Sequence, residues 1–187
     1  MKKLSILTLA VILLTMLAAC SGTPATTGTS SYADATEVLT KVWSTYADNE
    51  KFAAGGGDYD NTVMDGPGKF DVTKTEDLDA MLALPSAQAA NVDDAASLIH
   101  MMNANTFTGA AYRLKDGADV TAFANDFKAN LDSRRWMCGF PEKFVVIKTG
   151  NYVVTAFGNG EIVDLFKTKS TGTLENATVV LEAAIAG

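Results

Sequence analysis

Two adjacent arginines precede a tryptophan in the stretch RRWMCGFP, which covers residues 134–141. Guanidinium groups bind carboxylates and phosphates through paired hydrogen bonds, and they also stack on aromatic rings. Arg134, Arg135 and Trp136 are therefore candidate ligand-binding residues. The same pattern also suits the end of a helix, because cations stabilise a helix C-terminus, Gly139 suits a turn and the large apolar groups can fill a core. The pattern favours this helix-end interpretation.

Cys138 and His100 are the residues that could form a nucleophilic thiolate–imidazolium pair. No third catalytic residue or oxyanion-hole motif accompanies them, and a free cysteine usually behaves as a small apolar group. Met101 and Met102 follow His100, and thioethers beside an imidazole are typical of copper sites. Successive strand residues point to opposite faces, however, so a core or cross-strand role is expected. We therefore expect no metal and no cofactor.

The acidic stretch DYDN at residues 58–61, with Asp65 and Asp71 nearby, resembles a calcium loop at first sight. An EF-hand loop starting with this stretch would need Asp or Asn at its fifth position and Gly at its sixth. Thr62 and Val63 stand at those positions instead. We expect solvated loop carboxylates, with a loose oxygen site as the alternative.

Gly68 and Lys69 match only part of a phosphate-binding Walker A motif. That motif would also require Gly at position 63 and Ser or Thr at position 70, where the chain has Val63 and Phe70. The hydrolase and protease motifs GxSxG, HExxH and SxxK do not occur in the sequence. The sequence therefore contains no enzyme signature, and a non-enzymatic protein is expected.

The first twenty residues have the pattern of a lipoprotein export signal. Two lysines precede an apolar run over residues 4–19, which is shorter than the roughly 20 residues of a spanning helix. The run ends in Leu17-Ala18-Ala19-Cys20, which resembles the lipobox of bacterial lipoproteins. This resemblance implies cleavage before Cys20, with residues 1–19 removed, and a diacylglycerol thioether on the sulfur. The alternative is an ordinary signal peptide with an incidental cysteine.

Residues 20–31 are small, polar and uncharged, which predicts a flexible tether. Residues 32–187 are long enough for one globular domain with its own core. Without the two N-terminal lysines the chain has 13 basic and 22 acidic residues, a net charge of −9. Nucleic acids and anionic lipid surfaces attract clustered Lys and Arg, so neither is an expected partner. Lipidation of Cys20 would leave Cys138 without an intrachain disulfide partner.

Apolar spacing predicts an α+β domain. Helical periodicity occurs over residues 33–47, over 120–131 behind an Asp119 N-cap, and in a short segment capped by Asn159. Strands are predicted at residues 107–114, 144–147, 152–157 and 177–183, with a hairpin turn at 149–151.

Two further segments precede this region. Residues 73–76, TKTE, match a capping box before a short helix that Pro85 closes. Residues 95–104 fit either a strand or a helix, and composition favours a strand. From residue 107 to residue 183 the order β-α-β-β-α-β predicts a ferredoxin-like antiparallel sheet with both helices on one face. N-terminal helices and an extra strand or helix are expected additions.

Four segments resemble one group of proteins: MDGPGKFDVT (64–73), HMMNANTFT (100–108), RRWMCGFPEK (134–143) and GNYVVTAFGN (150–159). Together with the lipobox, they are similar to small lipoproteins of gut-dwelling Gram-positive anaerobes. This family is classed as a domain of unknown function, and some members carry the label bacteriocin transport accessory protein. The resemblance implies a lipid-anchored location on the outer face of the cell membrane, at a Gram-positive cell surface. It supplies no catalytic residues.

These observations predict a membrane-tethered, non-enzymatic accessory or protein-binding module that works beside a membrane protein partner. The alternative is a small-ligand binder that uses Arg134–Trp136 and the loop at 55–72. The domain is small for a two-lobed solute-binding protein. A cysteine-dependent enzyme using Cys138 is the third and least favoured hypothesis.

Overall fold

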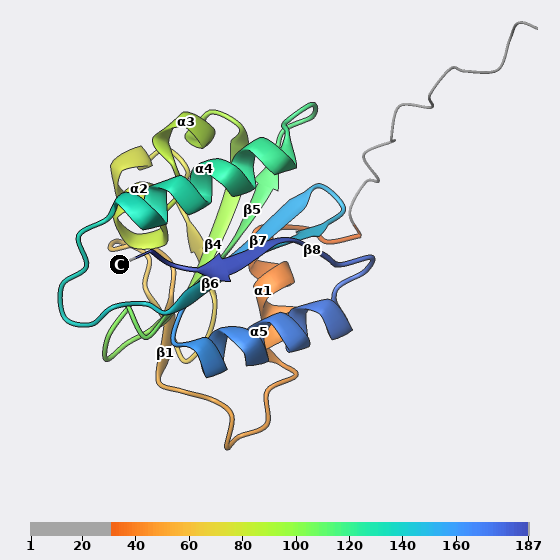
Figure 1. The fold of residues 1–187 in the computed structure, drawn as a ribbon. Coiled ribbons are helices and arrows are strands. Elements are labelled where there is room, and N and C mark those ends of the chain that lie inside the picture. Colours follow the sequence, from red (N-terminus) through yellow and green to blue (C-terminus); the bar gives the residue numbers. More distant parts are fainter. Residues whose placement is uncertain (1–30, 187) are drawn as a thin grey trace, which may run out of the picture.

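The computed structural model describes residues 31–186, so the export signal, Cys20 and the tether up to residue 30 lie outside the described residues. A single antiparallel sheet forms the middle layer, with helices on both of its faces (Figure 1). One face carries α1 (Ala35–Trp43) and α5 (Gly160–Thr173). The other face carries α2 (Thr75–Leu82), α3 (Ser86–Ala89) and α4 (Val120–Ser133). The predicted α+β class is confirmed.

Eight strands form the sheet within the described part of the chain. They are β1 (Ala54–Gly56), β2 (Val63–Met64), β3 (Gly68–Phe70), β4 (Val92–His100), β5 (Phe107–Leu114), β6 (Lys143–Thr149), β7 (Tyr152–Gly158) and β8 (Thr178–Ala184). Their order is β2-β1-β4-β5-β7-β6-β8, and β3 also pairs with β4. The segment at 95–104, which fitted strand or helix, is strand as far as His100. The predicted hairpin joins β6 to β7, with Gly150 and Asn151 between the paired Thr149 and Tyr152.

The strand order differs from the ferredoxin-like plan predicted for residues 107–183. In that plan the last strand would lie beside the first, whereas β8 pairs with β6. The free edge of β5 is occupied by β4, which precedes it in the chain and pairs along its length. The position that the plan reserves for the last strand is therefore filled.

The two helices of this region also lie on opposite faces, not on one face. Successive residues of β6 pack into the apolar cores on opposite faces of the sheet. Val145 packs with α5 residues, while Phe144 and Val146 pack with α4 residues. A strand buried on both faces is nearly continuously apolar, as the run of buried residues from Phe144 to Ile147 is. The domain consequently has two apolar cores, one on each side of the sheet.

Two of the three predicted helix N-terminal caps form. Asp119 and Asn159 accept hydrogen bonds from the first backbone N–H groups of α4 and α5, as predicted. Helix α1 ends at Trp43, earlier than residue 47. The capping box at residues 73–76 is wrong, because the Thr73 hydroxyl donates to the Asp71 carboxylate instead. Within residues 31–186 no helix is long and apolar enough to cross a bilayer.

Candidate functional site

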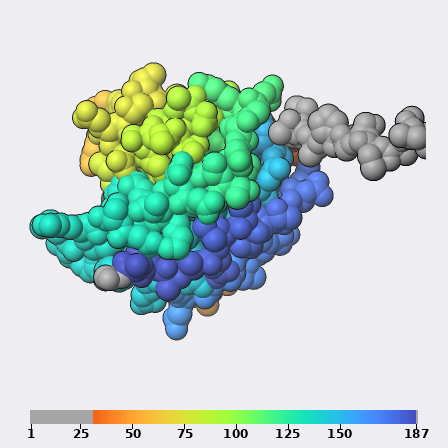
Figure 2. All heavy atoms as spheres, turned by 45° about the horizontal axis from the view of Figure 1, so that its top comes forward, coloured from red at the N-terminus to blue at the C-terminus, as the bar shows by residue number. Residues whose placement is uncertain are grey.

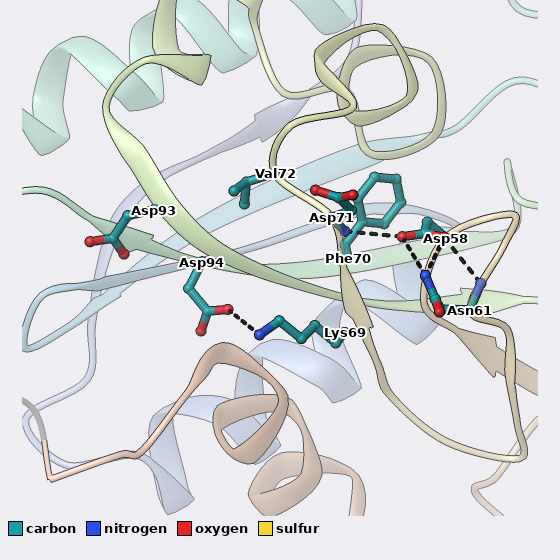
Figure 3. A pocket seen from close by; sticks show the side chains of 8 residues that line it. All are labelled: Asp58, Asn61, Lys69, Phe70, Asp71, Val72, Asp93 and Asp94. Carbon is teal, nitrogen blue, oxygen red and sulfur yellow. Dashed lines mark hydrogen bonds and ion pairs between the residues drawn. The ribbon is translucent and has the colours of Figure 1, made fainter.

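An acidic cleft of about 360 Å³ opens where β3 ends and the chain turns away from β4 (Figure 3). Its lining consists of Asp58, Asn61, Lys69, Phe70, Asp71, Val72, Asp93 and Asp94. It includes two members of the acidic stretch that resembled a calcium loop. Whether it can bind a cation depends on what its carboxylates already contact.

Asp58 is fully engaged by donors of its own chain. Its carboxylate accepts backbone N–H bonds from Asp60, Asn61 and Asp71, at 2.9 to 3.1 Å, and lies 3.1 Å from Lys74 Nζ. Burial alone would raise the pKa of Asp58, but these hydrogen bonds outweigh burial and hold its pKa at about 2. The carboxylate thus stabilises the loop as an anion surrounded by N–H donors.

The other buried carboxylate of this cleft is also occupied. Asp94 accepts the backbone N–H of Ala35 at 2.7 Å and lies 4.0 Å from Lys69 Nζ. Asp93 is paired with Arg113 at 2.6 Å. Among the residues that the structure describes, no group of three or more His, Cys, Asp or Glu side chains is arranged to hold a metal. We therefore assign the acidic cleft a structural role: it ties the first helix and the 58–71 loop to β4.

A second cleft, of about 420 Å³, lies on the face that carries α2 and α4. We call it the arginine cleft. Its lining comes from five parts of the chain that meet at one end of the sheet: Tyr59, Ala80, Met81, Ile99, Ala104, Asn105, Arg134, Arg135, Trp136, Met137 and Phe157. All three predicted binding residues, Arg134, Arg135 and Trp136, line it together.

Arg134 has a structural task within this cleft. Its guanidinium donates to the backbone carbonyl and the carboxylate of Asp79 and, at 3.3 Å, to the carbonyl of Ala80. Ala80 lies in the last turn of α2, where carbonyls have no partner within the helix, whereas the Asp79 carbonyl also accepts the backbone N–H of Ala83. Arg134 also lies 5.9 Å from the ring of Trp136. The preceding helix α4 does end at Ser133, with Arg134 as its C-cap, as the helix-end interpretation expects, and the Arg134 side chain also reaches the end of α2.

Arg135 differs from its neighbour. Its side chain is exposed, and it makes no hydrogen bond or salt bridge with any residue between 31 and 186. Trp136 is partly buried and packs on Phe157, with ring centres 5.6 Å apart. The indole Nε1 of Trp136 and the Nε of Arg134 are buried and have no acceptor within the described residues. The cleft thus combines a free cation with unpaired N–H donors.

Exposed apolar side chains surround the arginine cleft. Met102 is 83% exposed, Met137 is 78% exposed and Tyr59 is 70% exposed. The loop at 137–139 is held beside the β4–β5 loop by the side-chain amides of Asn103 and Asn105, which donate to its carbonyls. The two loops adjoin at the left of Figure 1, and the α4–β6 loop projects from the body of the domain in Figure 2.

The apolar surface continues across the edge of the sheet. Gly55 pairs with both Ile99 and Met64, so these two side chains share one face with the cleft. A Cβ atom on Gly55 would lie 3.3 Å from Met101 Cγ, which shows that Met101 covers this glycine on the same face. We call the exposed set the loop surface: Tyr59, Met64, Met101, Met102, Met137 and Phe140.

The cysteine and histidine hypotheses find no support in the geometry. Cys138 is exposed and has a positive φ of 62°, while the His100 ring stacks on Phe52 at 5.2 Å. His100 Nδ1 accepts the backbone N–H of Met102. No hydrogen bond joins the thiol to the imidazole within residues 31–186. The structure therefore does not assemble the predicted thiolate–imidazolium pair.

Sequence reasoning missed most of the loop surface. Tyr59 and the methionines have no periodic pattern that predicts exposure, and Asn103 and Asn105 resembled ordinary loop residues.

Comparison with protein-family models, with curated proteins and with solved structures finds no match to this chain.

Proposed function

We propose that this chain is a lipid-anchored extracytoplasmic module, without enzymatic activity, that docks a membrane protein partner through the loop surface. The observation that carries this proposal is the gathering of exposed methionine and aromatic side chains around a cleft with two arginines. Met, aromatic residues and Arg are the residue types enriched in protein interfaces. Exposed apolar patches on soluble domains typically mark interaction sites, and methionine surfaces adapt to their partners.

The end of the sheet at which the described chain begins supports the same proposal. Tyr32, near the start of the described chain, packs on Tyr152 and its hydroxyl accepts the backbone N–H of Glu175. Tyr152 begins β7, whereas Phe157, near the other end of β7, contacts Trp136. The chain therefore enters the domain at one end of the sheet, and the loop surface lies at the opposite end (Figure 1). A tether on Cys20 would leave this surface accessible to a partner beside the membrane.

The test is co-purification of the tagged full-length chain from native membranes. Met102→Asp and Met137→Asp place charge in the loop surface, and Val179→Asp makes the same change at an exposed apolar residue of β8. We expect a stoichiometric membrane protein partner that is retained with Val179→Asp and lost with either methionine variant. A partner retained in all three variants, or turnover of a cell-wall substrate by the purified chain, would contradict the proposal.

A small-ligand binder is the second candidate. The observation in its favour is the volume of the arginine cleft, about 420 Å³, which falls within the ~300–1,000 Å³ typical of small-molecule sites. A compound whose affinity disappears in Arg135→Ala but not in Met102→Asp would support this function. Met102 distinguishes the two candidates, because it belongs to the loop surface without lining the cleft.

A further inference from the structure

The arginine cleft has a charge opposite to that of the chain around it. The sequence has 22 acidic and 15 basic residues, yet the cleft lining contains two arginines and no acidic residue. The acidic cleft, by contrast, contains four aspartates and one lysine. The arginine cleft is therefore a local site of positive charge on an acidic domain.

Only one of the two arginines is available for a partner. Arg134 is held by Asp79 and Ala80 of α2, which fixes its guanidinium and compensates its charge. Arg135 has no such partner within residues 31–186, and its side chain is exposed. An approaching acceptor would meet the Arg135 guanidinium first.

Two further N–H donors on residues of the cleft lack an acceptor. Trp136 Nε1 and Arg134 Nε are buried without an acceptor in the described residues, and buried donors without acceptors cost free energy. The Asn105 amide nitrogen is already used to hold the 137–139 loop. The walls beside these donors are apolar, with Tyr59, Met137 and Phe157 among them.

We propose that the arginine cleft receives a segment of the partner protein in which a carboxylate follows or precedes an apolar side chain, with Arg135 as the residue that binds the carboxylate. This inference rests on the proposed function and specifies the chemistry of the partner. The carboxylate supplies acceptor oxygens for the exposed Arg135 guanidinium, and a charged hydrogen bond to guanidinium is stronger than a neutral one. The apolar neighbour packs on the Tyr59 and Met137 walls.

A bilayer is the other occupant that an arginine beside exposed apolar groups could contact. The described residues favour a protein as the occupant, because the loop surface lies at the end of the sheet opposite to Tyr32, near which the described chain begins. The acidic balance of the chain also opposes adsorption on anionic lipid. The experiment nevertheless includes a membrane arm, since its outcome separates the two occupants.

The test selects displayed random peptides on the immobilised full-length chain and then measures synthetic copies of the enriched peptides. Each peptide has a twin in which Asp or Glu is replaced by Asn or Gln. We expect enriched peptides to carry an acidic residue next to an apolar one, and each twin to bind about 10-fold or more weakly. Arg135→Gln should weaken the acidic peptide by a similar factor and the twin hardly at all. Arg135→Lys should retain part of the affinity.

Lys41→Gln is the matched control, since it removes the same charge from α1 on the other face of the sheet, and it should leave peptide affinity unchanged. Equal binding of peptide and twin, with loss of binding in Met137→Asp, would overturn the carboxylate inference while the docking proposal stands. A selection that enriches no peptide would contradict both. Recruitment of a Cys20→Ala chain to phosphatidylglycerol vesicles that depends on Arg135 would assign the cleft to lipid and overturn the inference.

Discussion

Tyr32 and Trp136 lie against opposite ends of the same strand. The Tyr32 ring contacts Tyr152 at the start of β7, with centroids 6.1 Å apart, and the Trp136 ring contacts Phe157 near its end, at 5.6 Å. The point where the described chain begins and the arginine cleft are thus separated by most of the length of the sheet. A domain tethered near Tyr32 would therefore present the arginine cleft at its other end.

Anchoring through Cys20 is the first prediction. The wild-type chain should fractionate with membranes and carry a diacylglycerol group on its first residue, which mass spectrometry of the mature N-terminus detects. Cys20→Ala should move the chain to the soluble fraction without changing the stability of the domain. A variant that stays in the membrane fraction would show that another segment provides the anchor.

Replacing Arg134 and replacing Arg135 should change the stability of the domain by very different amounts. Arg134→Gln removes the ion pair with the Asp79 carboxylate and the hydrogen bond to the Ala80 carbonyl, and should lower the free energy of unfolding by about 2 kcal/mol. Arg135→Gln removes the same charge from an exposed side chain and should change it by less than about 0.5 kcal/mol. Urea unfolding of both variants provides the comparison, and equal losses would mean that the two roles are not distinct.

Asp58 should make the free energy of unfolding depend on pH in the acid range. Its pKa is about 2 in the folded chain, below the ordinary 3.8, so the folded state binds a proton less readily than the unfolded state. The resulting stabilisation, about 2 kcal/mol, is complete above pH ~4 and is lost as the pH falls toward the folded pKa. Unfolding measured across this pH range should show the loss in the wild type but not in Asp58→Asn.

The control for this experiment is Asp60→Asn. Asp60 also pairs with Lys74, but its carboxylate is exposed, and exposed ion pairs contribute little. We expect the acid dependence of this variant to match that of the wild type. If the acid dependence also disappeared in Asp60→Asn, its source would be the ion pair with Lys74 and not the N–H donors around the buried Asp58 carboxylate.

Gly56 tests the close packing that holds the 57–62 loop and its Tyr59 beside the cleft. A Cβ atom on Gly56 would lie 2.1 Å from the backbone nitrogen of Gly68, so the two chain segments would have to separate. Gly56→Ala should destabilise the domain by at least about 2 kcal/mol. Gly172→Ala in α5 meets no atom within 4 Å, and should stabilise it by about 0.5 kcal/mol. Thermal unfolding distinguishes the two, and a neutral Gly56→Ala would show that the contact can relax.

Local patterns were sufficient to predict the longer elements, but not the short β1, β2, β3 and α3. The helical spacing behind Asp119 and Asn159 and the short turn after Thr149 all depend on residues close in sequence, and all three are found in the structure. The strand order was not predictable in this way. The edge of β5 is already occupied by β4, and β8 therefore pairs with β6. That competition involves segments far apart in the chain.

The sequence identified residues of the candidate site but not the roles of those residues. Arg134, Arg135 and Trp136 meet in one cleft, as their adjacency suggested. The task of Arg134 depends on Asp79, which lies 55 residues earlier in the sequence and is brought near only by the packing of α2 against α4. Tyr59 joins the cleft from the 55–72 loop, which the ligand-binding alternative had combined with these residues, but no pattern distinguished Tyr59 within that loop.

The most direct test of the docking proposal is a photoreactive benzoylphenylalanine placed at Met137 of the full-length chain in living cells, with the same residue at Val179 as the control. We expect a crosslink to one membrane protein from position 137, absent from position 179 and lost when Cys20→Ala removes the anchor. Equal crosslinks from both positions, or none from position 137, would contradict a docking role for the loop surface.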